Sequence, residues 1–164
     1  MAQKSILKLS EVNQENRIDA EFYKKEFLDN EELIMQKKWK TLKELTTKIT
    51  DGSHITPNYT NEGIPFLMVR NIGKLDINFE DIKFIDKKFD NLLRGCKPKK
   101  NDILLSKVGT LGRLALVSND KDFNIFVSLA VLKGIKEINL YYLTTFLLTR
   151  NAYLQYQRYA KGIS

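Results

Sequence analysis

Short apolar runs, each ended by a polar loop, dominate the middle of this sequence and favour a β-rich core. Residues 51–59 read Asp-Gly-Ser-His-Ile-Thr-Pro-Asn-Tyr, where Asp-Gly is a turn signal and the proline holds the preceding residue extended. Residues 102–113 end a second apolar run in Ser, Lys, two Gly, Thr and Arg. A packed core needs neither loop. We therefore interpret both as parts of a surface that contacts something polar and anionic.

The hydrophobic periodicity predicts an α+β fold: a single domain with a twisted β-rich core, an N-terminal helix and C-terminal helices. The expected order over residues 1–164 is an irregular lead-in (1–16), a helix (17–38), the β-rich core with its loops (39–138) and a helical segment (139–160). Within the core we expect strands at 65–69, 82–85, 102–106, 114–117 and in 123–132, and a brief helix at 87–94. The Gly-Thr-Leu-Gly loop between two of these strands predicts a hairpin. Candidate packing residues are Phe22, Phe27, Leu28, Leu33 and Ile34 near the N-terminus, and Leu140, Leu143, Leu147, Tyr153, Tyr156 and Tyr159 near the C-terminus.

Positive charge is concentrated after the first helix. The chain holds 27 Lys and Arg against 20 Asp and Glu, a net charge of +7, yet residues 1–38 hold 7 against 8. The segment 87–113 alone holds 8 against 2. Such a segment is typical of a surface that binds a phosphate backbone, although an ordinary solvated face would carry the same charge.

The sequence lacks the residues that several classes of site and segment require. Cys96 is the only cysteine and His54 the only histidine, so the sequence predicts no internal disulfide and no zinc site. No apolar run is long enough to span a membrane, residues 1–19 lack a signal-peptide core, and we expect a cytoplasmic protein.

Catalytic motifs are weak or missing. A phosphate-binding Gly-x-x-x-x-Gly-Lys loop is absent. Asp76 with Asp81 and Lys83 could bind magnesium as in a nuclease, but a solvated acidic turn explains them better. The Thr-Pro-Asn-Tyr of residues 56–59 only mimics an adenine methyltransferase loop, because no glycine-rich cofactor turn accompanies it. We expect no catalytic residue, metal or cofactor in this chain.

Three sequence motifs in this order resemble the target recognition domain of the specificity (S) subunits of type I restriction–modification systems. They are residues 51–57, residues 66–72 (Phe-Leu-Met-Val-Arg-Asn-Ile) and residues 101–112, which read Asn-Asp-Ile-Leu-Leu-Ser followed by Gly-Thr-x-Gly at 109–112. The C-terminal domain of type IIG restriction–methylation enzymes is similar. The resemblance runs from about Arg17 to Gly162, and one departure is Asn101, where such domains commonly carry Gly.

The resemblance implies a non-catalytic domain that reads about half of a bipartite site in double-stranded DNA. It implies an adenine-N6 methyltransferase partner, subunit or fused domain, which alone binds S-adenosylmethionine and flips the target base. It also implies a possible translocase and nuclease (restriction) subunit, and a homodimer or a second recognition domain. On this reading the chain is a half-size S subunit, a fragment or the tail of a fused enzyme.

Side-chain chemistry ranks the candidate DNA-binding residues of this resemblance. Expected base readers are Asn58, Arg70, Asn71, Lys107 and Arg113; expected phosphate or thymine-methyl contacts are Thr56, Tyr59, Ser106 and Thr110; expected backbone positioners are Lys97, Lys99 and Lys100. Structural roles compete with these. Asp51 and Ser53 would satisfy turn amides, His54 would pack or cap, and any single cation would be merely solvated.

A different class of function stays open. A general basic nucleic-acid-binding module without a methyltransferase partner would share the composition. RNA binding could use Tyr59 and Phe66 as stacking aromatics. A membrane-surface protein would need a basic amphipathic helix, whereas the basic segment here mixes turns and strands.

Overall fold

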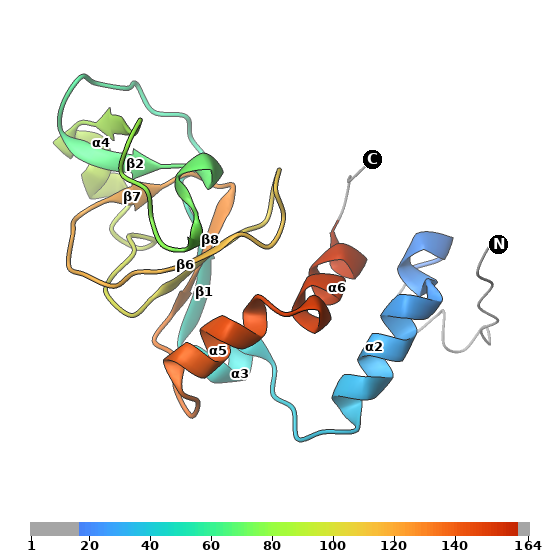
Figure 1. The fold of residues 1–164 in the computed structure, drawn as a ribbon. Helices are drawn as coiled ribbons and strands as arrows, with labels where there is room; N and C mark the ends of the chain where they lie inside the picture. Colours follow the sequence, from blue (N-terminus) through green and yellow to red (C-terminus); the bar gives the residue numbers. More distant parts are fainter. Residues whose placement is uncertain (1–16, 161–164) are drawn as a thin grey trace. The chain divides into compact units, whose positions relative to one another are not determined.

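The computed structural model describes residues 17–160, and these form two compact units. The first unit takes its described residues from Met1–Trp39 and Thr149–Ser164, and the second is Lys40–Leu148. The expected lead-in, 1–16, lies outside the described residues. The α+β class is confirmed, with strands and helices both present (Figure 1), whereas the single-domain expectation for residues 1–164 stays a prediction.

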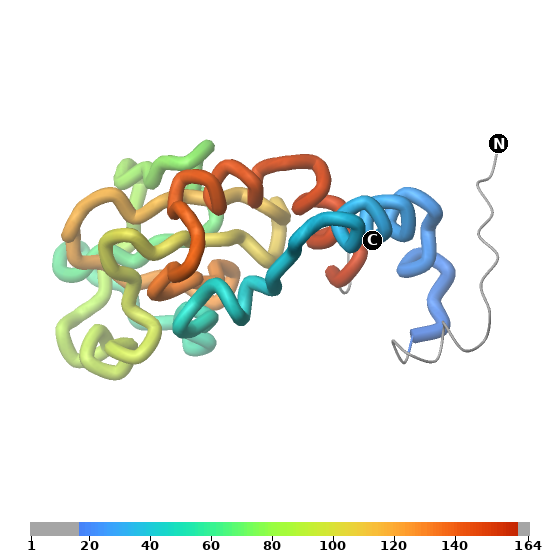
Figure 2. The backbone as a smooth tube through the Cα atoms, turned by 90° about the horizontal axis from the view of Figure 1, so that it is seen from below, coloured from blue at the N-terminus to red at the C-terminus, as the bar shows by residue number. Residues whose placement is uncertain are grey.

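The described residues of the first unit form helices and no strand. They are the 3-10 turn η1 (Ala20–Tyr23), α2 (Lys25–Met35) and α6 (Arg150–Tyr159). Helices α2 and α6 lie side by side (Figure 2). Asn30 donates its amide to the carbonyl of Asn151 at 3.0 Å, and Asn151 donates its own amide to the Asn30 side chain at 2.7 Å. This reciprocal pair fixes the register of the two helices.

Phe22 is the hydrophobic centre of this unit. Its ring is 1% exposed and lies between two guanidinium groups, those of Arg17 at 4.4 Å and Arg158 at 4.3 Å. Arg158 is buried too, and it donates to the Phe22 carbonyl and pairs with Glu31 at 2.7 Å. The expected helix over 17–38 is therefore shorter and begins with a turn. The expected packing role of Leu33 is wrong, because that residue is half exposed.

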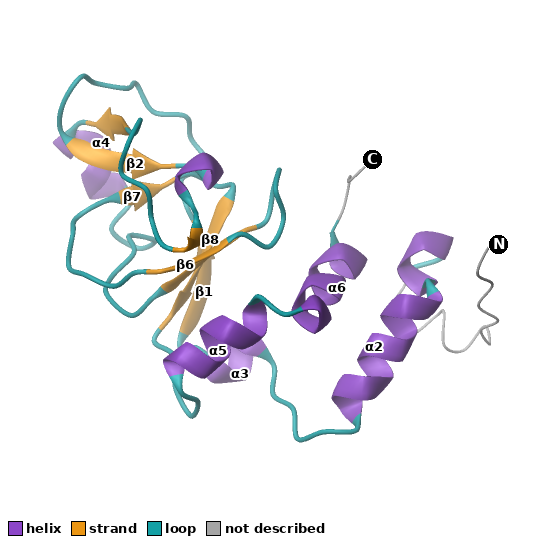
Figure 3. Ribbon diagram, viewed as in Figure 1, coloured by secondary structure: helices purple, strands orange, loops and turns teal. Residues whose placement is uncertain are grey.

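The second unit contains two sheets (Figure 3). The larger sheet has the order β1-β8-β5-β6-β3, and the smaller has the order β4-β2-β7. Their bounds are β1 Lys48–Asp51, β2 Ile64–Leu67, β3 Lys74–Leu75, β4 Lys83–Ile85, β5 Ile103–Ser106, β6 Leu114–Leu116, β7 Asn124–Ile125 and β8 Leu129–Lys133. Strand β8 pairs antiparallel with both β1 and β5, and so connects these two strands in the larger sheet.

One apolar core joins the two sheets. Leu67 and Ile125 come from the smaller sheet, and Leu104, Ala115 and Val131 come from the larger one, all nearly or wholly inaccessible. Burial of this continuous set supplies the main hydrophobic stabilisation of the unit. The loops that connect the strands emerge around this core, so a rigid scaffold positions them.

The predicted hairpin is confirmed. β5 and β6 pair antiparallel, with Leu104 opposite Ala115. Gly109 and Gly112 in the connecting turn have φ values of 76° and 78°, the left-handed region that glycine tolerates. Asn101 before β5 also has a positive φ of 71°. Asparagine tolerates this conformation better than most residues, which explains how it replaces the common glycine.

Short helices complete the second unit. They are α3 (Leu42–Leu45), the 3-10 turn η2 (Val69–Asn71), α4 (Lys87–Leu92) and α5 (Leu140–Leu147). Asp86 caps α4 through the Phe89 amide, as the sequence indicates. Thr41 and Glu44 form a reciprocal capping box that starts α3, a helix that the sequence analysis did not predict within the β-rich core at 39–138. Between residues 17 and 160, no helix is long and apolar enough to cross a membrane.

Candidate functional site

The first motif loop, residues 52–59, begins with a glycine that lies against β7. The Gly52 amide donates to Leu129 and the Ser53 amide donates to Ile125, at 3.1 and 2.9 Å. A Cβ atom on Gly52 would lie 2.2 Å from the Ile125 carbonyl oxygen, well inside van der Waals contact. Only glycine allows this approach, so the Asp-Gly motif serves to attach the loop to the smaller sheet.

Beyond this attachment the loop turns outward. The Ser53 hydroxyl accepts from the Ile55 amide at 3.2 Å and donates to its carbonyl at 2.7 Å, which confirms the turn-stabilising role for Ser53. Thr56 and Asn58 are exposed, and Tyr59 is 39% exposed. These three predicted contact residues are therefore accessible to a ligand.

An ion pair joins the end of β1, just before the first motif loop, to the second motif loop, residues 107–113. The Lys107 ammonium lies 2.5 Å from the Asp51 carboxylate, which ends β1, and the Lys107 amide donates to Ser128. The expectation that Asp51 would satisfy a turn amide is wrong, because its carboxylate faces the side chains of Lys107 and His54. His54 is also not packed: its side chain is 71% exposed, with Nε2 3.5 Å from Asp51.

Ser106 holds the second motif loop closed. Its hydroxyl donates to the Thr110 carbonyl at 2.5 Å and accepts from the Arg113 amide at 2.8 Å. Ser106 is 1% exposed, so the predicted direct DNA contact through this hydroxyl is wrong for the observed conformation. Its role is to position Thr110 and Arg113, which are exposed.

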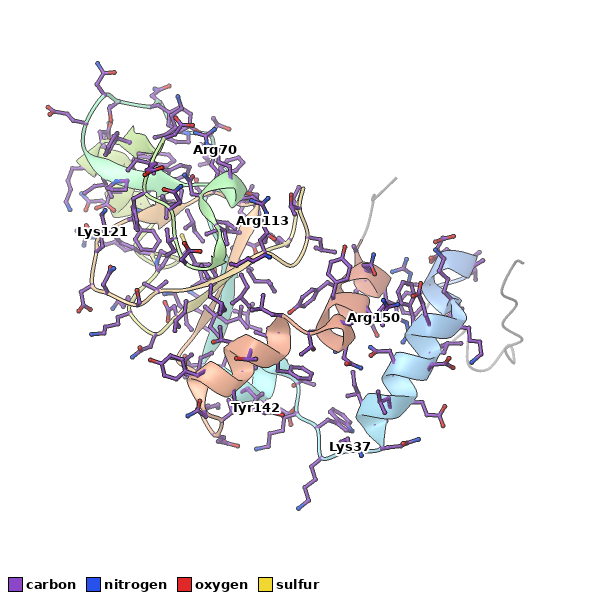
Figure 4. All side chains as sticks on the ribbon, in the orientation of Figure 1. Lys37, Arg70, Arg113, Lys121, Tyr142 and Arg150 are labelled. Carbon is purple, nitrogen blue, oxygen red and sulfur yellow. The ribbon has the colours of Figure 1, made fainter. Side chains whose placement is uncertain are left out.

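Arg113 connects the second motif loop to the segment after β2. Its guanidinium donates to the Ile72 carbonyl at 3.4 Å, and Arg70 lies on the neighbouring turn η2 (Figure 4). Arg70 is exposed and donates to the Asp81 carbonyl at 3.3 Å. The Asp81 carboxylate lies 3.8 Å from Arg70 Nε. Both arginines thus project from short, hydrogen-bonded turns.

Asn71 is buried rather than available to a base. Its side-chain oxygen accepts from the Met68 amide at 3.0 Å, and its Nδ2 donates to the Glu80 carbonyl at 3.4 Å. The residue is 3% exposed. To contact a base, the Asn71 side chain would have to break both hydrogen bonds. In this structure Asn71 therefore shapes the turn that carries Arg70.

The accessible predicted residues lie on the two motif loops and η2, which together we call the motif surface. Its members are Thr56, Asn58, Tyr59, Arg70, Lys107, Thr110 and Arg113. Carboxylates accompany its cations, since Asp51 pairs with Lys107 and Asp81 lies near Arg70. The motif surface therefore offers varied hydrogen-bonding groups on a rigid base, with little net charge.

Lys97 is a structural cation, contrary to its predicted role as a phosphate contact. Its ammonium lies 2.5 Å from Asp90 and 2.6 Å from Asp122, and its side chain is only 17% exposed. Burial by itself would lower the pKa of Lys97, but the hydrogen bonds that its ammonium donates to Asp122 and Asp90 outweigh it and raise the pKa. Burial would likewise raise the pKa of Asp90, yet hydrogen bonds from Lys97, Lys87 and Asn124 lower it.

Lys99 and Lys100 are exposed, but they lie at the other end of β5 from the second motif loop. Four strand residues separate the two ends, a rise of roughly 13 Å. The basic segment 87–113 is therefore divided between two places on the second unit. Sequence proximity alone suggested one continuous footprint.

Two alternative readings were a magnesium site at Asp76 and Asp81 and an RNA-stacking surface at Phe66. Among the described residues, no group of three His, Cys, Asp or Glu side chains could hold a metal ion. Asp76 and Asp81 are both exposed. Phe66 is fully buried, so it cannot stack on a base as an RNA-binding platform would require.

Comparison with known proteins gives a curated match over part of the chain. The chain is 33% identical over 64 residues to the type I restriction enzyme EcoBI specificity subunit of Escherichia coli. These residues make up 39% of this chain and 14% of that subunit, so the chain spans a small part of this relative. No protein-family model matches the chain.

Two solved structures share a weaker likeness. The HsdS subunit from Thermoanaerobacter tengcongensis has a TM-score of 0.49 at 17% identity, over 94% of this chain and 40% of that one. A chain from a study of complex assembly and conformational transition of the type I R-M system has a TM-score of 0.45 at 16% identity, over 85% and 37%. Both TM-scores lie below 0.5, so we infer nothing from them. The curated match confirms that this chain resembles a type I restriction specificity subunit.

Proposed function

We propose that this chain is a DNA target recognition domain of a restriction–modification system. It binds double-stranded DNA through the motif surface and reads about half of a target site. The side chains of Arg70, Arg113, Lys107 and Asn58 are the proposed base readers, because each can present hydrogen-bond donors to a base edge. Thr56, Tyr59 and Thr110 would contact phosphate or a thymine methyl group.

One observation carries this proposal: three motifs far apart in the sequence converge on one rigid surface. The Asp51–Lys107 pair joins the first and third motifs, and the Arg113–Ile72 bond joins the end of the third motif to the second. Planar guanidinium groups held at turn ends are well suited to bidentate recognition of guanine. The curated relative, whose name describes a specificity subunit, points to the same function.

The proposed partners follow from that relative and not from this chain's own geometry. An adenine-N6 methyltransferase, as a subunit or fused domain, would bind S-adenosylmethionine and modify the positioned base. A restriction subunit would join the complex, and a homodimer or a second recognition domain would read the other half of the site. The chain itself would hold no cofactor and catalyse no reaction, and its place of action would be the cytoplasm.

A salt titration tests DNA binding itself. If four to six phosphates are neutralised, the slope of log K against log salt concentration should be about −4 to −5. Fluorescence anisotropy with a labelled duplex measures this slope. A slope near zero would contradict electrostatic binding of any duplex by the chain.

Methyl transfer tests the division of labour. The purified chain, incubated with labelled S-adenosylmethionine and duplex, should transfer no methyl group. It should acquire sequence-dependent binding and support methylation only with a type I methyltransferase subunit. Methyl transfer by the chain alone would overturn the non-catalytic assignment. Equal affinity for every sequence in the reconstituted complex would favour the alternative, a general basic nucleic-acid-binding module.

A further inference from the structure

A second, more strongly basic surface lies at the end of the large sheet away from the motif surface. It is an open groove of about 730 Å³, and we call it the basic groove. Its lining includes Arg94, Lys97, Lys99, Lys100 and Lys133, with Asp102 as its only acidic residue. Carboxylates outside the lining pair with two of these cations, Lys97 and Lys100, whereas Arg94 and Lys99 have no carboxylate partner within residues 17–160.

Some of these cations are fixed within the fold. Lys133 lies 2.7 Å from Asp102 and donates to the Lys97 carbonyl, while Lys97 is held by Asp90 and Asp122. Asp102 also accepts from the Lys99 amide at 2.8 Å. These contacts tie the turn over residues 97–102 to β8, so the groove has a defined wall.

The remaining cations are available to a ligand. The Lys99 ammonium has no ion pair within residues 17–160, Lys100 lies 3.8 Å from the exposed Asp120, and Arg94 donates to the neighbouring Asn91. Exposed pairs of this kind contribute at most about 1 kcal/mol and exchange readily for another anion. Tyr141, 71% exposed on α5, adds an aromatic ring and a hydroxyl to the lining.

We infer that the basic groove is a second nucleic-acid contact that holds a sugar–phosphate backbone without regard to sequence. Several accessible cations on one polar turn match closely spaced phosphates, and a tyrosine hydroxyl is a common phosphate donor. An acidic protein surface is the competing ligand. Ile135, Ile138 and Leu140 also line the groove, but the cations Arg94, Lys99 and Lys100 at its accessible edge match closely spaced phosphates, so we commit to the phosphate backbone.

The test compares two pairs of adjacent exposed lysines in the full chain. Lys99→Ala/Lys100→Ala removes two cations from the basic groove. The control, Lys37→Ala/Lys38→Ala, removes two exposed cations that follow α2 in the first unit (Figure 4). Circular dichroism checks the fold of each variant. Anisotropy is measured across a salt series with a labelled duplex and with a labelled polyglutamate peptide.

The groove variant should have a salt slope on duplex DNA about two units shallower than the unsubstituted chain. Cognate and scrambled duplexes should weaken by the same factor, and the control should change neither slope nor affinity beyond experimental error. Amide NMR signals of residues 99–101 should shift when a 12-base-pair duplex is added. Slopes equal to the control, or loss of polyglutamate binding with unchanged duplex binding, would overturn the inference.

The inference and the proposed function can fail separately. The groove predicts sequence-independent losses, whereas the motif surface predicts changes in base preference. Because the sites are separate, Arg70→Ala/Arg113→Ala and Lys99→Ala/Lys100→Ala should have additive effects on binding free energy. An unchanged base preference in the arginine variant would reject the motif surface and leave the groove standing. An unchanged slope in the lysine variant would do the reverse.

Discussion

The ammonium of Lys107 lies 2.5 Å from the carboxylate of Asp51, and this pair joins the second motif loop to the end of β1, a segment distant in the sequence. Both side chains are about one-third exposed, so solvent screens the pair and it adds little to stability. Its larger consequence is electrostatic. Asp51 neutralises a cation on the motif surface, where DNA is proposed to bind.

Removing that carboxylate charge should strengthen DNA binding without changing base preference. In Asp51→Asn the Lys107 ammonium is released to a phosphate, so the salt slope should become about one unit steeper. Asp29→Asn is the matched control, because Asp29 pairs with Lys25 at 2.7 Å on the exposed side of α2. Anisotropy salt titrations of both variants provide the measurement, and weaker binding by Asp51→Asn would show that the ion pair positions the loops instead.

Gly52 should tolerate no side chain. In Gly52→Ala the new methyl group would meet the backbone carbonyls of Ile125 and Phe126, and the free energy of unfolding should fall by roughly 3 kcal/mol. Gly95→Ala is the control, since the nearest atom to its new Cβ would be Lys48 Nζ at 4.0 Å. Urea unfolding measures both variants. Equal stabilities would mean that the first motif loop is not anchored as observed.

Ser106→Ala should loosen the second motif loop. It removes both bonds of the hydroxyl and leaves the Arg113 amide without that acceptor, at a cost of about 1–3 kcal/mol in unfolding free energy. Exposed Ser118→Ala should stay within about 0.5 kcal/mol. Hydrogen exchange at residues 109–113 should rise in the first variant alone; unchanged exchange there would reject the positioning role.

Acid should destabilise the second unit partly through Asp90. Its pKa is lowered in the folded chain, so its contribution to stability is present above the unfolded pKa of about 3.9 and is lost as pH falls through the folded pKa. The unfolding free energy should therefore decline below about pH 4, and the decline should be shallower in Asp90→Asn. Urea titrations between pH 2 and 6, a range chosen to bracket that pKa, give both slopes. Identical slopes in the two proteins would show that Asp90 does not contribute to the acid destabilisation.

Local patterns predicted the parts of the fold that local chemistry decides. The β5–β6 hairpin and the Asp86 cap follow from turn and capping residues next to each other in the sequence. Helix α3 was missed because the threonines that follow it, Thr46 and Thr47, favour strands, although Thr41 and Glu44 carry a capping signature. The parallel pairs β2–β7 and β3–β6 join distant segments that no nearby residue specifies.

The candidate site was predicted in its location more than in its individual residues. Asn71 and Ser106 have the chemistry of DNA contacts, but residue type does not reveal that both face inward. Lys97 has a distant partner, Asp122, which the sequence cannot assign to it. Lys99 and Lys100 lie close to Lys107 in the sequence, yet the extended strand β5 carries them to the opposite end of the sheet.

The central claim is that the motif surface reads bases, and Arg70 and Arg113 test it most directly. The measurement is competition binding of Arg70→Ala and Arg113→Ala against single-base variants of the cognate site, in a reconstituted methyltransferase complex. Each substitution should cost about 1–3 kcal/mol on the cognate site and relax the preference at one base pair. Equal weakening on cognate and scrambled DNA would make both arginines backbone contacts and would contradict the claim.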